Sequence, residues 1–444
     1  MYAGIQLDQA PLISIPFRFL LTGPWFGVLS GMLIFFMGDT MVISRWQPET
    51  LALVHVLVLG FITMVMVGAL FQMLPVVAGV SVNHAQGLSW LVHLGISLGT
   101  LLLVFAFLFR ITLLYGLASA FLIPALVALI IAMTLSLKRA IPTHTSAAGM
   151  KLALIALFIT LCLAALLIFI RISQGYYFLY YSVFLSQLHQ LWGLIGWITM
   201  LIIAIAFQVI PMFQMTPEYP GLFKKLLLPV LFSGLIMLSA DWMLVALGVI
   251  TSGLSERLAI FLVGLVFLSF SLQTMRLQSQ RKRRIRDTGF WFWRVALLSL
   301  LLCAIILLSR GWLIDGYKRL DPNQWHFIVA ILFLYGFVVT LVNGMLYKIV
   351  PFLVWLHLQQ SAMSAEPMYT GRIPDMKSII SDDTIWPQFW LHISALTSLL
   401  LWVFYTDTYR IAGFLVCLSF GKLGLSLNAA FRRYRSELAL IKTP

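Results

Sequence analysis

Charged residues are scarce in this sequence. Asp, Glu, Lys and Arg together make up 10% of its 444 residues, whereas hydrophobic residues make up 61%, and the mean hydropathy is +0.99. A typical soluble domain has about 25% charged and about 45–50% apolar residues. The shortage of charge therefore excludes a soluble globular protein and indicates a chain that lies in a lipid bilayer.

Cysteine is also scarce, and Cys162, Cys303 and Cys417 all fall inside apolar runs. Their spacing fits neither a disulfide framework nor a cysteine-ligated metal, and no Cys-x-x-Cys-His motif for covalent haem attachment occurs. The first fourteen residues lack the basic region and cleavage site of a signal peptide, so we expect the first apolar span to remain in the mature protein.

Long apolar runs dominate the rest of the chain. Twelve of them reach the roughly 20 residues needed to cross about 30 Å of hydrocarbon. Inside lipid such runs can only be helices, because every backbone polar group must be paired internally. The sequence thus predicts an all-α polytopic membrane protein, with residues 1–444 forming a single membrane domain. The runs cover residues 16–37, 50–74, 87–109, 111–136, 150–170, 179–213, 226–250, 257–275, 290–309, 323–356, 386–406 and 411–430.

The net charge of +14 comes mostly from basic residues in the connections between these runs and near the ends of the runs. When each basic residue is assigned to the nearer end of its run, and Lys422 in the last run is left out, twenty lie on the side of the N-terminus and eight on the other side. Such an imbalance is a topology signal, so we expect no nucleic-acid partner and place both termini in the cytoplasm. The expected location is a membrane, and specifically a bacterial inner membrane.

An internal repeat of roughly 140 residues organises the chain. The second, sixth and tenth runs each contain a glycine fifteen residues before a proline, with a threonine shortly after the glycine. We therefore expect three four-helix pseudo-repeats over approximately 1–140, 141–285 and 286–444. The glycine and proline pairs are Gly60 and Pro75, Gly196 and Pro211, and Gly336 and Pro351.

One histidine precedes each repeated glycine. His55, His189 and His326 lie towards the expected outer ends of the second, sixth and tenth helices. Ionisable side chains inside a membrane are costly and mark candidate functional sites. Imidazole is a good ligand for haem iron and copper, although a single membrane histidine can also serve as a hydrogen-bonding residue between helices. The histidines lie five, seven and ten residues before their glycines, which favours a ligand pair over one three-histidine site.

This arrangement resembles the heme-copper oxidase subunit I superfamily, and it is most similar to the NnrS-like proteins associated with the nitric-oxide response. The resemblance implies twelve helices in three arcs with both termini in the cytoplasm. It further implies that His55 and His326 are the axial ligands of a b-type haem and that His189 corresponds to a copper ligand. A separate electron-transfer protein or a quinol is the expected redox partner.

Several parts of an oxidase are missing from the sequence. Gln324 stands where the resemblance would place a second haem ligand, and Gly193 stands where many oxidases carry a tyrosine. The seventh helix has no histidine pair, and the eighth has no lysine for proton uptake. We therefore expect no catalytic residues for dioxygen reduction, and we do not expect the protein to be an oxidase.

Three further polar residues lie within apolar runs. His93 and His392 occur in similar sequences early in the third and eleventh helices, so they look like copies of one repeat position. They are candidates for a second metal site or for hydrogen bonds between helices. Asp241, late in the seventh helix, is either a proton-relay carboxylate or a residue at the membrane interface.

Two main functions fit these observations. The first is a haem-binding membrane protein that acts in the nitric-oxide or metal stress response or in electron transfer. The second is a secondary transporter or permease in which the histidines only form hydrogen bonds, since transporters also contain internal repeats and polar residues within their spans. A third, a reductase that uses His189 at an unusual metal site, lacks further ligands near the outer face. An absorption spectrum separates the first function from the second.

Overall fold

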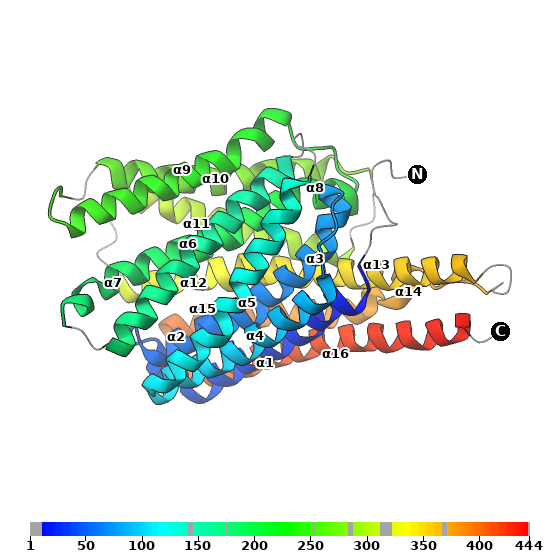
Figure 1. Ribbon diagram of the computed structural model, residues 1–444, viewed down its shortest axis with the longest axis horizontal. Helices are drawn as coiled ribbons and strands as arrows, with labels where there is room; N and C mark the ends of the chain where they lie inside the picture. The colour runs from blue at the N-terminus through cyan, green and yellow to red at the C-terminus, as the bar shows by residue number, and fades with distance from the viewer. Residues whose placement is uncertain are drawn as a thin grey trace. The chain divides into compact units, whose positions relative to one another are not determined.

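A computed structural model describes residues 11–140, 145–173, 176–251, 254–282, 287–310, 322–365 and 371–442 (Figure 1). His144 and the first ten residues lie outside the described residues. The elements, in chain order, are α1 (Ser14–Met41), α2 (Pro48–His55), η2 (Val56–Thr63), α3 (Met64–Ala78), α4 (Ala85–Phe109), α5 (Thr112–Lys138), α6 (Thr145–Ser173), α7 (Tyr176–Leu191), η3 (Trp192–Thr199), α8 (Met200–Gln214), α9 (Gly221–Ala246), α10 (Leu254–Ser279), α11 (Thr288–Arg310), α12 (Pro322–Ala330), η4 (Ile331–Val339), α13 (Thr340–Ser364), α14 (Met376–Ile379), α15 (Asp382–Phe404), η5 (Thr406–Thr408) and α16 (Tyr409–Lys442).

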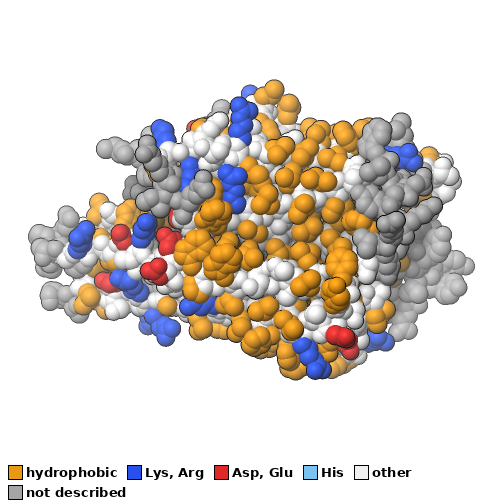
Figure 2. Space-filling model, turned by 180° about the vertical axis from the view of Figure 1, so that it is seen from behind, with side chains coloured by type: hydrophobic (Ala, Val, Ile, Leu, Met, Phe, Trp, Pro, Cys, Tyr) orange, Lys and Arg blue, Asp and Glu red, His pale blue; other side chains and the backbone are white. Residues whose placement is uncertain are grey.

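The expected membrane helices are present. Within the described ranges, twelve helices are long and apolar enough to cross a membrane, which agrees with the twelve runs of the sequence. Many large hydrophobic side chains are exposed on these helices, and Figure 2 shows hydrophobic side chains gathered in a broad area over the middle of the face drawn. The protein is therefore an all-helical polytopic membrane protein.

The three helices that carry the repeated motif are the most deeply buried of these twelve. Residues in their apolar windows are 67%, 72% and 72% buried for Pro48–Pro75, Ser182–Gln214 and Gln324–Ser364, against 33% to 56% for the others. Their side chains mostly contact protein rather than lipid. Polar groups on these helices are therefore well placed to form internal sites.

Each of these three helices contains a π-helical stretch, in which the turn is wider than in an α-helix. The stretches η2, η3 and η4 each span the repeated glycine and end at the threonine or at the residue before it. The Thr199 and Thr340 hydroxyls donate to backbone oxygens five residues earlier, on Leu194 at 3.0 Å and on Tyr335 at 2.9 Å. π-Helix accounts for well under 1% of residues in proteins and is frequent at functional sites.

The chain divides into two compact units, and each is described by itself. The first comprises Met1–Pro11, Leu70–Arg284 and Leu297–Phe333. In this unit α4 packs on α5, α9 packs on α10, and α6 packs on both η3 and α8 (Figure 1). A methyl group added to Gly196 would lie 2.7 Å from the Ala156 Cβ, so η3 and α6 approach each other through small residues.

The second unit comprises Leu12–Ala69, Ile285–Ala296 and Leu334–Pro444. Here α16 packs along α1, and α15 and α13 pack on α16 (Figure 1). A Cβ on Gly413 would lie 2.4 Å from the Phe35 backbone nitrogen, and one on Gly31 would lie 2.6 Å from the Cys417 nitrogen. The backbones of α1 and α16 are thus in direct contact, the arrangement by which helices associate most closely in lipid.

Candidate functional site

His55 is the last residue of α2 and directly precedes η2 in the second unit. Its Nδ1 lies 2.7 Å from the Leu51 backbone oxygen, one helical turn earlier. Because a carbonyl oxygen can only accept, the proton is on Nδ1, and in the neutral ring Nε2 carries the lone pair. Histidines that bind metals usually donate their other ring nitrogen to a carbonyl or carboxylate in this way. The local helix geometry therefore gives His55 the tautomer of a ligand that binds through Nε2.

His189 has a similar arrangement in the first unit. It lies on α7, and its Nδ1 is 3.1 Å from the Thr160 backbone oxygen on α6. The ring thus donates to a neighbouring helix and also presents Nε2 as its lone-pair nitrogen. Gly193, one turn later, packs on the same threonine, and a Cβ there would lie 3.3 Å from the Thr160 methyl group. The position expected for a tyrosine in an oxidase is therefore tightly packed against α6.

His326 lies on α12 and is half-buried, as is Gln324 two residues earlier. It belongs to the first unit, whereas His55 belongs to the second. The pairing of His55 with His326 therefore stays a prediction. His93, on α4 of the first unit, is half-buried and packs edge-on against Trp90 at 6.3 Å between ring centroids. Its role as a metal ligand also stays a prediction.

His392 is fully buried on α15 in the second unit. Its Nε2 lies 2.7 Å from the Thr340 hydroxyl, and its Nδ1 lies 3.3 Å from the Asn343 amide nitrogen. The Thr340 hydroxyl already donates its proton to the Tyr335 carbonyl, so it accepts from Nε2–H. The Nδ1 lone pair then accepts from Asn343. The ring also stacks on Tyr335, with centroids 4.6 Å apart.

Both ring nitrogens of His392 are therefore engaged by protein groups. This arrangement favours hydrogen bonding between helices over metal binding at this position. It also shows why His392 matters to the fold, because the same threonine closes the π-helical stretch η4. Copper or iron binding at His392 would require the loss of at least one of these hydrogen bonds.

Metal ligands do not cluster in the part of the chain that the structure describes. Among these residues, no group of three or more His, Cys, Asp and Glu side chains is placed to hold a metal ion. A copper site at His189 with three protein ligands is thus not seen in the described residues. Haem makes a smaller demand on the protein, because the porphyrin supplies four nitrogen ligands and one or two side chains complete the coordination.

Asp241 lies inside α9, five residues before the helix ends, and is buried. The Ser255 hydroxyl, at the start of α10, donates to its Oδ1. Its Oδ2 has no hydrogen-bond partner among the described residues. A buried carboxylate with one unpaired oxygen is not simply a solvated interfacial residue. The Asp241 carboxylate is enclosed between α9 and α10, and its role as a proton relay stays a prediction.

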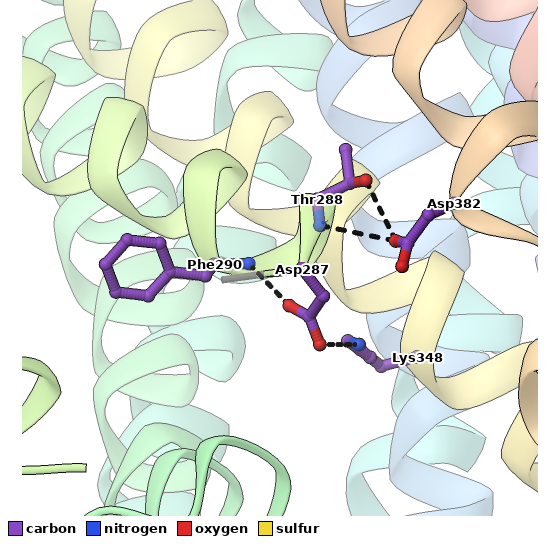
Figure 3. Close-up of polar contacts among 5 residues, drawn as sticks. All are labelled: Asp287, Thr288, Phe290, Lys348 and Asp382. Atoms are coloured by element: carbon purple, nitrogen blue, oxygen red, sulfur yellow. Dashed lines mark hydrogen bonds and ion pairs between the residues drawn. The ribbon is translucent and has the colours of Figure 1, made fainter. Parts of the chain in front are cut away.

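A polar cluster that the sequence analysis did not foresee lies at the start of α11 in the second unit (Figure 3). Lys348 Nζ lies 2.6 Å from Asp287 Oδ2, and Asp287 Oδ1 accepts from the Phe290 backbone nitrogen at 3.1 Å. Asp382 Oδ1 accepts from the Thr288 hydroxyl at 3.0 Å. The cluster joins α11, α13 and α15. An acidic residue just before a helical run is the usual signal for such a helix cap.

Comparison with known proteins does not assign this chain to a family. No model of a protein family matches the chain, and no curated protein matches it. The function is therefore inferred from the residues and contacts described above.

Proposed function

We propose that this protein is a haem-binding integral membrane protein in which His55 and His326 are the axial ligands of a b-type haem. Its role is in electron transfer or in the response to nitric oxide or metal stress. The observation that carries the proposal is the 2.7 Å hydrogen bond from His55 Nδ1 to the Leu51 carbonyl. It gives a half-buried membrane histidine the tautomer that binds iron through Nε2, and it restrains the ring.

Histidine is the residue type that a haem with two protein ligands requires, and His55 and His326 each offer one imidazole. Both histidines lie on spans that are mostly buried, so the group would be shielded from lipid. A haem bound there supplies a one-electron redox centre or a site for a small gas molecule. The contribution of the protein is to hold the imidazole of His55 in a fixed orientation through Leu51 and to exclude water with apolar neighbours.

The sequence argues against dioxygen reduction as the function. The helix α9 contains no histidine, α10 contains no lysine, and Gln324 and Gly193 occupy positions at which an oxidase would need other side chains. An oxidase centre needs a high-spin iron with an open position beside a copper ion, and the ligands decide what such metals can do. The proposed protein therefore retains the low-spin haem of that architecture without its oxygen-reducing centre.

The positions of the π-helical stretches support the proposed three pseudo-repeats over 1–140, 141–285 and 286–444. The stretches η2 and η3 begin four residues before the repeated glycine, and η4 begins five residues before it. All three end three residues after the glycine. Since π-helix is rare, this shared register favours descent from one four-helix unit. We propose on this basis an oxidase-like arrangement of arcs, with both termini in the cytoplasm of a bacterial cell.

A transporter is the second candidate. The observation in its favour is His392, whose two ring nitrogens are both hydrogen-bonded within the protein. If His55 and His189 also serve only to form hydrogen bonds within the protein, a permease with internal repeats is the function that fits the sequence. A purified transporter of this kind would show no Soret absorption, whereas the haem protein would.

The test is a set of three variants purified from membranes of haem-replete cells. His55→Ala and His326→Ala should each abolish the low-spin bis-histidine spectrum while leaving the amount of membrane-inserted protein unchanged. The control is His84→Asn, because His84 is exposed at the start of α4 and its φ of 50° suits asparagine. His84→Asn should keep the wild-type spectrum. A wild-type spectrum in both alanine variants would rule out these ligands.

A further inference from the structure

Fully buried polar side chains lie between α13, α15 and α16 in the second unit. Asn343 on α13, Gln388 and His392 on α15 and Ser419 on α16 all have 0% exposure, and Tyr347 on α13 has 3%. These groups differ in chemistry from the polar cluster of Figure 3, because they contain no ion pair. The proposed haem site does not use these side chains.

Two of these side chains use the donor of their amide group in a hydrogen bond but leave the acceptor oxygen unpaired. Gln388 Nε2 donates to the Ser419 hydroxyl at 3.2 Å, but its Oε1 has no hydrogen-bond partner in the described part of the chain. Asn343 Nδ2 donates to His392 Nδ1, but its Oδ1 is likewise unpartnered among the described residues. Leaving a buried acceptor unpaired destabilises a protein by about 1–3 kcal/mol, and buried polar groups are nearly always paired with protein or water.

The side chains that carry the unpaired atoms lie within one helical turn of the hydrogen bond between Asn343 and His392. Tyr347 follows Asn343 by one helical turn on α13, and Gln388 precedes His392 by one turn on α15. The Phe292 ring contacts both Tyr347, at 6.2 Å, and Phe389, the neighbour of Gln388, at 5.0 Å. Tyr347 and Gln388 therefore lie on the same side of the Asn343–His392 hydrogen bond. The Tyr347 hydroxyl has Ser426 as a polar neighbour, but it makes no hydrogen bond of normal geometry within the described residues.

Aromatic rings pack around these polar side chains. Phe292 also approaches His392, at 6.0 Å between centroids, and Tyr335 stacks on the other side of the imidazole. Beyond Tyr335, Phe420 packs edge-on against Phe61 at 4.8 Å. These rings cover much of the polar region, while Ser419 and the Tyr335 hydroxyl are polar neighbours within it. The unpaired oxygens of Asn343 and Gln388 can be satisfied by a small polar molecule held among these side chains.

We propose that this region is a binding site for ordered water, in which one or more molecules bridge Asn343 Oδ1, Gln388 Oε1 and the Tyr347 hydroxyl. A buried water typically makes about three hydrogen bonds, and these groups offer two acceptors and one hydroxyl. Water at Asn343 Oδ1 fixes the orientation of the amide, so that Nδ2 stays directed at His392. The site thereby holds His392 in the tautomer that donates to Thr340 and secures η4.

The test uses X-ray hydroxyl-radical footprinting of the full-length protein, a method that modifies side chains beside bound water even when they are buried. Tyr347 should be modified several-fold faster than Tyr219. Tyr219 is the matched control, because it is 2% exposed and its hydroxyl is paired with Thr274 at 2.8 Å. Equal rates at the two tyrosines would overturn the proposal, and this comparison needs no variant.

A substitution provides the second arm. Gln388→Met removes the acceptor while keeping the length of the side chain, and it should lower the Tyr347 rate towards that of Tyr219. Gln360→Met, near the end of α13, is the control and should leave the Tyr347 rate unchanged. A Tyr347 rate that is equally high in Gln388→Met would reject Gln388 as part of the site. Failure of that variant to fold leaves the wild-type comparison to decide.

Discussion

At the scale of single residues, the partners of a histidine decide what its ring can do. His55 donates to a carbonyl one turn earlier and keeps Nε2 as a lone-pair nitrogen, whereas His392 uses both nitrogens on Thr340 and Asn343. The sequence placed both histidines correctly inside apolar helices. It could not separate their roles, because the tautomer depends on contacts that come from another helix or from the backbone.

The hydrogen bonds of Thr340 predict a clear effect of its replacement. Thr340→Val removes the acceptor for His392 Nε2–H and the donor to the Tyr335 carbonyl, so two buried groups lose their partner. We expect a loss of about 1–3 kcal/mol in stability for each unpaired group, and thermal unfolding in detergent measures it. Thr406→Val, on the exposed turn η5, should stay within about 0.5 kcal/mol of wild type. Equal melting temperatures for Thr340→Val and Thr406→Val would contradict this account of His392.

At the scale of elements, the length and apolarity of the runs were enough to predict the twelve spans. They were not enough to predict where a span changes from α-helix to π-helix. The stretches η2, η3 and η4 are more apolar than the α-helical segments on either side, but apolarity does not specify how many residues make a turn. The repeated glycine and threonine were visible, and only the structure links them to the wider turns. The helix that ends near residue 356 in the sequence analysis continues to Ser364, since its last residues are polar yet still helical.

The contact between α1 and α16 gives the sharpest test at this scale. Gly413→Ala would place a methyl group 2.4 Å from the Phe35 nitrogen, so we expect destabilisation of about 1–3 kcal/mol. Gly421→Ala lies on the same helix with nothing within 4 Å of its Cβ, and should stabilise by up to about 1 kcal/mol. Thermal unfolding of both variants, side by side, measures the difference. Similar melting temperatures would show that the two helices are not closely packed.

At the scale of the whole molecule, composition alone predicted a polytopic helical membrane protein, and the twelve long apolar helices agree. The pairing of His55 with His326 as haem ligands came from the resemblance and stays a prediction. His55 and His326 belong to different units, and a pairing between distant segments leaves no periodic signal in the sequence. The polar cluster around Lys348 and Asp287 was missed for the same reason, because its members are 61 residues apart.

The proposed orientation rests on the distribution of basic residues and can be tested directly. In a variant without native cysteines, Lys282→Cys should react with an impermeant maleimide only from the cytoplasmic side. Thr406→Cys, in the connection between α15 and α16, should react only from the opposite side. Both positions are exposed, so accessibility does not limit the reaction. Labelling of Lys282→Cys from outside would reverse the proposed topology.

The central claim is that the protein holds haem through two histidines. The most direct measurement is the reduced-minus-oxidised absorption spectrum of the purified wild-type protein, together with its haem-to-protein ratio. We predict roughly one low-spin, non-covalently bound haem per chain, with the sharp α-band of bis-histidine coordination. Protein that is purified intact from haem-replete membranes and shows no Soret band would contradict the proposal and favour the transporter.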